Sequence, residues 1–134
     1  MPQYDIDNPP EPDDVGESLS SADIGIIRYG GRFVQSQDNC GTIAVKVAGM
    51  FGLDLDIGSI REKVDLVNLC NMPKIYRGDM RIPEPAGKAR LVVCDGDRFM
   101  KHVYLRVGEK DYNFGVGASN GYQEQAVLGL SPLE

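Results

Sequence analysis

A chain of 134 residues, 42% hydrophobic and 25% charged, is long enough to bury the core of one domain. Its 20 acidic and 14 basic residues give a formal net charge of −6, which disfavours broad nucleic-acid binding because that requires a basic surface. No apolar run approaches the ~20 residues that a membrane-crossing helix needs, so we expect neither a nucleic-acid partner nor a membrane partner.

The first 20 residues are rich in proline and acidic side chains, beginning MPQYDIDNPPEPDD. Such a segment has little apolar surface to bury, and it predicts a disordered lead-in to a single domain over residues 21–134. It also lacks the basic start and apolar core of a signal peptide. We therefore expect a cytoplasmic protein, or one exported without a conventional signal peptide.

The next segments predict a strand and two helices. ADIGIIRYGGRFV, residues 22–34, has a short apolar run before a glycine pair and predicts a strand and turn. Over 41–53 apolar residues recur at three- and four-residue steps, which predicts a helix that Gly52 closes. The same period over 57–69 predicts a second helix, with Asp56 as its N-terminal cap.

The second half of the chain changes to a period of two. Residues 71–89 contain three prolines and predict a connecting loop. After it we expect a buried strand in ARLVVCD, a hairpin of FMKHVYLRV and KDYNFGV around Gly108-Glu109, and an edge strand in AVLGL. The order predicts an α+β fold, with N-terminal helices packed on a C-terminal antiparallel sheet.

Three cysteines at wide spacing, Cys40, Cys70 and Cys94, do not form a disulfide framework, and no C-x-x-C pair is present. At least one thiol must lack an intramolecular bridge. A metal site built on Cys94 and His102 lacks further ligands. The calcium-loop-like stretch 54–65 has its glycine one position early. We expect no metal and no cofactor.

Cys40 lies where a polar loop meets the helix predicted over 41–53. Unpaired backbone N–H groups and the positive end of the helix dipole stabilise a thiolate there, which lowers the pKa of the thiol. Asp38 and Asn39 make the approach polar, and Gly41 lets a substrate come close to the backbone. The alternative interpretation is a buried structural cysteine.

His102 is the only histidine, so it is the only imidazole that could serve as a base for Cys40. A type II′ turn at Gly108-Glu109 places Asn113 diagonally across the hairpin from His102, within reach of a side-chain hydrogen bond. Asp111 faces Arg106, and we keep it as a reserve for the orienting role. A slip of one residue would exchange the two faces of the hairpin and expose two aromatic side chains. The favoured register instead predicts a core face of Val103, Leu105, Val107, Tyr112 and Phe114.

A nucleophile, a base and a residue that orients the base are the minimum set for thiol-based acyl transfer. An oxyanion hole is also needed. The backbone N–H of Cys40 would supply one donor, and the side-chain amide of Gln35 or Gln37 could supply a second.

The order of these residues resembles that of the papain-like cysteine hydrolases, which include peptidases, peptidoglycan amidases and transglutaminase-like enzymes. The resemblance covers residues 33–116: a cysteine opens a helix (QSQDNCGTIAV), a histidine opens a strand (KHVYLRV), and a polar residue follows on the next strand (DYNFG). It implies a papain-like fold with Cys40 as nucleophile, His102 as general base and acid, Asn113 as orienter, and Gln35 or Gln37 as oxyanion donor.

The chain also departs from that pattern. It has CGTIA in place of C-G-[SA]-C-[WY], and its glutamines lie five and three residues before the cysteine, not the usual six. Cys40 and His102 are 62 positions apart, against ~130–150 in the papain branch, so this would be a minimal version.

These observations predict a small cysteine hydrolase that cleaves an amide bond in a peptide or a peptidoglycan-like substrate through a thioester. Two alternatives remain open: transglutaminase- or deamidase-type acyl transfer on a protein, and a non-catalytic interaction domain. An acidic start without an export signal would also suit an effector, whose partners would include a cognate inhibitor or immunity protein.

Overall fold

The computed structural model describes residues 2–20, 40–78, 80–85, 87–95, 101–114 and 122–133. The strand and turn predicted over 22–34 lie outside these residues. The elements in chain order are α1 (Pro12–Ser20), α2 (Cys40–Met50), α3 (Ile57–Cys70), α4 (Lys74–Arg77), β1 (Ala89–Cys94), β2 (His102–Val107), β3 (Lys110–Tyr112) and β4 (Glu124–Gly129).

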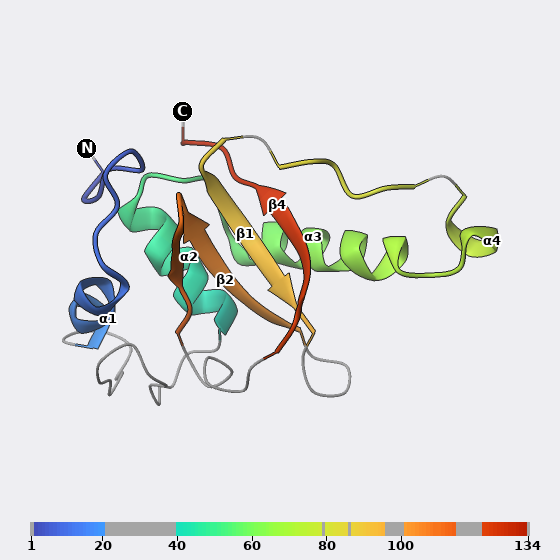
Figure 1. Cartoon of the computed structure of the whole chain (residues 1–134), viewed down its shortest axis with the longest axis horizontal. Coiled ribbons are helices and arrows are strands. Elements are labelled where there is room, and N and C mark those ends of the chain that lie inside the picture. The colour runs from blue at the N-terminus through green and yellow to red at the C-terminus, as the bar shows by residue number, and fades with distance from the viewer. Residues whose placement is uncertain are drawn as a thin grey trace.

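The four strands form one open antiparallel sheet in the order β3-β2-β1-β4. Helix α2 packs on β2, and α3 contacts both α2 and β4, so the two longer helices cover the same face of the sheet (Figure 1). Helices followed by an antiparallel sheet make an α+β arrangement, as the sequence predicts.

Both longer helices follow the predicted periods. In α2 the buried positions are Ile43, Ala44, Val47 and Ala48, one stripe that faces the sheet. Each valine or isoleucine so buried contributes about 1.5–3 kcal/mol. The side chain of Asp56 accepts a 2.7 Å hydrogen bond from the Ser59 N–H and caps α3, which confirms the predicted start of that helix.

The hairpin of β2 and β3 has the predicted register. Leu105 pairs with Tyr112, Arg106 with Asp111 and Val107 with Lys110. The predicted core face is buried as one set with α2: Val103, Leu105, Val107, Tyr112 and Phe114. The opposite face of the sheet carries a smaller buried cluster of Val92, Cys94 and Tyr104.

The N-terminal segment differs from the disordered lead-in expected over residues 1–20. Residues 12–20 form α1, and Val15 and Leu19 are buried in the main core. The Tyr4 N–H donates to the Met50 carbonyl at 2.8 Å, and the Tyr112 hydroxyl donates to the Pro10 carbonyl at 2.6 Å. Composition suggested disorder because the apolar residues are few, but those few meet an apolar surface that the rest of the chain provides.

The connection between α3 and β1 also contains more structure than the predicted loop. Its residues 71–85, here called the arm, include the single helical turn α4, and the described ones among them project away from the sheet (Figure 1). Among the described residues, no helix has both the length and the apolar character needed to cross a bilayer.

Candidate active site

Cys40 is the first residue of α2, as the sequence suggests, and its side chain is half-buried. The buried stripe of α2 packs on β2, and this contact brings the N-terminal end of the helix to the start of that strand. The sulfur lies 3.9 Å from the carbonyl oxygen of Lys101, the residue before β2. Helix packing thus places the thiol beside residues more than sixty positions further along the chain.

His102 is the first residue of β2 and is 96% buried, with only 4% of its surface exposed. Its Nε2 lies 2.6 Å from the Oδ1 of Asn113, which follows β3. An amide oxygen only accepts hydrogen bonds, so Nε2 carries the proton and Nδ1 is left for another partner. The Cys40 thiol and this imidazole interact closely enough to shift each other's pKa, so the three side chains form one connected set.

The two titratable groups of this set shift each other's pKa. Burial acts to raise the pKa of Cys40, but the hydrogen bond with His102 and backbone N–H contacts from Val103 and Gly41 outweigh it, so this pKa is lowered. Burial acts to lower the pKa of His102, but hydrogen bonds with Cys40 and Asn113 outweigh it, so this pKa is raised. Both shifts favour a thiolate beside an imidazolium.

Two tyrosine rings flank the histidine. The ring centroids of Tyr104 and Tyr122 lie 5.9 and 6.0 Å from that of His102. Tyr104 lies on the face of the hairpin opposite the predicted core face. No pattern in the sequence singles out Tyr122, which comes from a distant segment before β4. These rings restrict the orientations that the imidazole can adopt.

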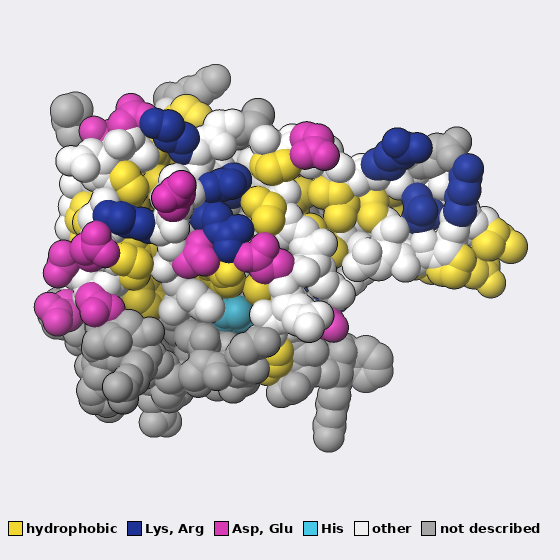
Figure 2. Space-filling view, viewed as in Figure 1, with side chains coloured by type: hydrophobic (Ala, Val, Ile, Leu, Met, Phe, Trp, Pro, Cys, Tyr) yellow, Lys and Arg dark blue, Asp and Glu magenta, His cyan; other side chains and the backbone are white. Residues whose placement is uncertain are grey.

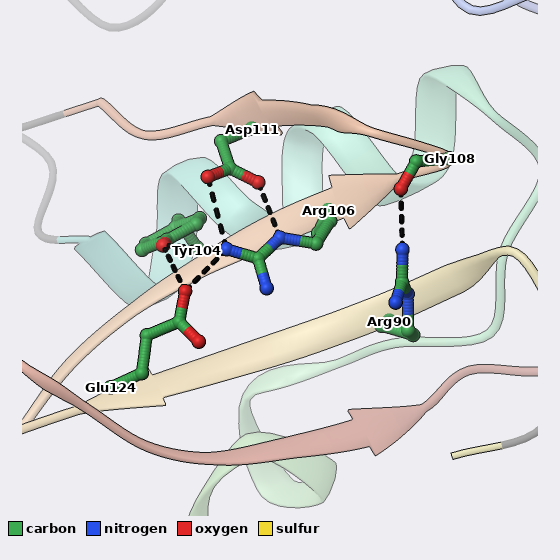
Figure 3. A network of polar contacts seen from close by, with 6 residues as sticks. All are labelled: Arg90, Tyr104, Arg106, Gly108, Asp111 and Glu124. Atoms are coloured by element: carbon green, nitrogen blue, oxygen red, sulfur yellow. Dashed lines mark hydrogen bonds and ion pairs between the residues drawn. The ribbon is translucent and has the colours of Figure 1, made fainter.

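Asp111, the reserve for the orienting role, has a different partner. Arg106 donates from Nε to one carboxylate oxygen of Asp111 at 2.5 Å and from Nη2 to the other at 3.1 Å. The same guanidinium contacts Glu124, whose carboxylate also accepts from the Tyr104 hydroxyl at 3.3 Å (Figure 3). Such a bidentate pair is structural, so Asn113 and not Asp111 contacts the histidine.

Cys94 lies directly opposite His102 in the register of β1 and β2. Burial and the nearby Glu124 carboxylate raise the pKa of its thiol to about 11. The site therefore has two thiols near one imidazole, and their pKa values shift in opposite directions. Only Cys40 has the electrostatic surroundings of a nucleophile.

The remaining predicted residues divide into two groups. Gly41 is the second residue of α2, and its backbone N–H helps to lower the pKa of Cys40. Gln35, Gln37, Asp38 and Asn39 lie outside the described residues. Within the described part of the chain, no three His, Cys, Asp or Glu side chains gather in a way that could hold a metal ion.

Comparisons with known proteins identify no relative. The chain matches no protein-family model, and neither the curated proteins nor the solved structures contain a significant match. What this site does must therefore be argued from its side chains.

Proposed function

We propose that this protein is a papain-like cysteine hydrolase that cleaves an amide bond in a peptide or peptidoglycan-like substrate. One observation carries the proposal: a thiol at a helix N-terminus has its pKa lowered by an imidazole whose Nε2 is held by an amide oxygen. Nucleophile, base and orienter in this order are the working parts of thiol acyl transfer.

In the first half-reaction the Cys40 thiolate attacks the carbonyl carbon of the substrate. A sulfur–carbon bond forms, and the electron pair of the carbonyl moves to its oxygen. The backbone N–H of Cys40 supplies a hydrogen-bond donor for that oxyanion. When the intermediate collapses, the carbon–nitrogen bond breaks, and His102 gives its proton to the leaving amine.

In the second half-reaction water hydrolyses the thioester. His102, now neutral, takes a proton from the attacking water, and the sulfur–carbon bond breaks to release the acid. Thiolate and imidazolium are restored. Asn113 holds the ring throughout, so that the same nitrogen faces the sulfur in both half-reactions.

The test is amide hydrolysis by three variants of the full chain. Wild-type protein should release amine from a library of fluorogenic peptide amides or from peptidoglycan fragments, and Cys40→Ala should abolish this. Cys70→Ala is the matched control, because Cys70 is another half-buried free cysteine and should retain activity. Activity that survives in Cys40→Ala would refute the proposal, as would a fall of many degrees in its melting temperature.

The same experiment separates hydrolysis from acyl transfer. If a small primary amine added to the reaction replaces water and appears in the product, the enzyme is of the transglutaminase type. If only the free acid forms, water is the acceptor, as we propose.

A further inference from the structure

The arm, residues 71–85, exposes an unusual group of hydrophobic side chains. Five large hydrophobic residues are exposed in the described part of the chain, and four belong to the arm: Met72, Ile75, Tyr76 and Met80. Ile75 is 83% exposed and Tyr76 68%. Single exposed hydrophobic residues are common, but four within nine positions at the end of a projection indicate a contact surface.

The arm holds these side chains in a fixed arrangement. The Arg77 guanidinium donates from Nε to the Met72 carbonyl at 2.8 Å and from Nη1 to the Met80 carbonyl at 2.7 Å. One side chain therefore hydrogen-bonds to the backbone on both sides of α4. The exposed residues Ile75 and Tyr76 are presented by a formed loop, so docking would cost little ordering entropy.

The charge of the arm is opposite to that of the remaining chain. Residues 71–85 have three basic and two acidic side chains, whereas the other residues have eleven basic and eighteen acidic, out of totals of 14 and 20. Figure 2 shows Lys and Arg side chains gathered on the arm beside the hydrophobic side chains at its outer end. The arm therefore complements an anionic surface that would repel the rest of the molecule.

We propose that the arm docks this protein on an anionic membrane surface, with Ile75 and Tyr76 inserted at the interface and the cations at the lipid headgroups. Aliphatic and aromatic side chains next to lysine and arginine are the usual composition of such a contact. The projection lets the arm touch the lipid while the acidic body stays further away, where salt screens its repulsion with a Debye length of about 8 Å.

This proposal changes the expectation of no membrane partner, which considered only spans long enough to cross a bilayer. The small number of residues in the arm also favours a lipid partner over a protein partner. A stable protein–protein interface uses about 20–30 residues from each side. The arm has only fifteen. A lipid interface requires no shape-matched partner, so a small contact of exposed hydrophobic side chains with neighbouring cations suits reversible binding.

The first test is sedimentation of the full chain with vesicles. Protein should sediment with vesicles of phosphatidylcholine mixed with phosphatidylserine, and it should not do so with phosphatidylcholine alone or at high salt. Arg81→Gln should weaken binding roughly fivefold. Ile75→Ser should weaken it roughly tenfold or more. Arg77 is left intact because its hydrogen bonds form the arm.

Two variants outside the arm are the matched controls. Arg61→Gln removes an exposed arginine from α3, and Leu133→Ser removes a leucine that is 60% exposed near the C-terminus. Both should bind vesicles like the wild type. Failure to bind any vesicle at low salt would overturn the proposal. So would equal binding to uncharged vesicles, unchanged binding by Ile75→Ser, or binding to polyglutamate but not to lipid, which would indicate an acidic protein partner.

A spectroscopic test reports insertion directly. The chain contains no tryptophan, so Tyr76→Trp places a single fluorophore on the arm. Its emission should shift to shorter wavelength with phosphatidylserine vesicles. A tryptophan introduced by Leu133→Trp should show no shift. A Tyr76→Trp emission that does not change in a protein that sediments with the vesicles would rule out insertion.

Discussion

The Oδ1 of Asn113, the residue after β3, and the Nε2 of His102, the first residue of β2, lie 2.6 Å apart. This hydrogen bond places the ring proton on Nε2 and leaves Nδ1 available to the thiol of Cys40. The reactivity of the thiol therefore depends on a contact that the imidazole makes through Nε2.

Iodoacetamide should alkylate Cys40 first at pH 6, because the pKa of this thiol is lowered and a thiolate is the reacting species. Cys94 should stay unreactive in the folded protein, since it is buried and the pKa of its thiol is raised to about 11. Peptide mapping by mass spectrometry after brief labelling identifies the modified residue. Earlier labelling of Cys70 or Cys94 would contradict a nucleophilic Cys40.

Asn113→Ala should lower kcat by roughly a hundredfold, because the histidine loses the group that orients it. Asp111→Asn is the matched comparison, since Asp111 contacts Arg106 and not the histidine. That variant should keep its activity and lose about 1 kcal/mol of stability or less, because Arg106 still contacts Glu124. Steady-state kinetics of the two variants distinguishes them; a larger loss in Asp111→Asn would reverse the assignment.

The pH profile of kcat/KM should be bell-shaped. Activity should rise as the thiolate forms, at a lower pH than for an ordinary thiol, because the pKa of Cys40 is lowered. It should fall as the imidazolium loses its proton, at a pH above about 6.5, because the pKa of His102 is raised. The two apparent pKa values of this profile describe Cys40 and His102 as a coupled pair and not either residue alone.

The pH profile of the Asn113→Ala variant tests whether Asn113 acts through the pKa of His102. The hydrogen bond from Asn113 raises the pKa of His102, so its removal should move the falling limb to lower pH. The same profile recorded on Asp111→Asn should match the wild type. A falling limb that stays in place in Asn113→Ala would mean that Asn113 does not act through His102.

Val15→Ala should destabilise the protein by about 2 kcal/mol, because this side chain is fully buried and its removal leaves a cavity. Leu133→Ala, at a 60% exposed position, should cost less than about 0.5 kcal/mol. Urea unfolding of both variants measures the difference. If Val15→Ala unfolds like the wild type, α1 does not contribute to the core.

The hairpin of β2 and β3 could be predicted in detail because its determinants are local. A two-residue turn at Gly108 sets the register, and alternation then assigns Leu105 and Tyr112 to the core. The diagonal neighbour relation between His102 and Asn113 follows from that register. The hydrogen bond between them is therefore the part of the candidate site that can be predicted from local sequence.

The segments whose structure depends on distant contacts were predicted less well. Val15 and Leu19 are isolated in an acidic, proline-rich stretch, and their burial depends on a surface made by residues a hundred positions away. Tyr122 packs on His102, and no pattern in the sequence predicts this contact. The exposure of Ile75 and Tyr76 is equally invisible in sequence, since a loop with apolar residues usually folds back on its domain.

Local patterns in the chain specify two amphipathic helices, the alternation of the strands and the hairpin register, because each depends on neighbours a few residues apart. Composition alone shows that there is one imidazole. Tertiary structure alone decided that Cys40 meets His102 across 62 positions, that α1 joins the core, and that the arm projects. The physical reason is that burial and side-chain approach depend on which surfaces meet when the helices dock on the sheet, and local periodicity does not specify that.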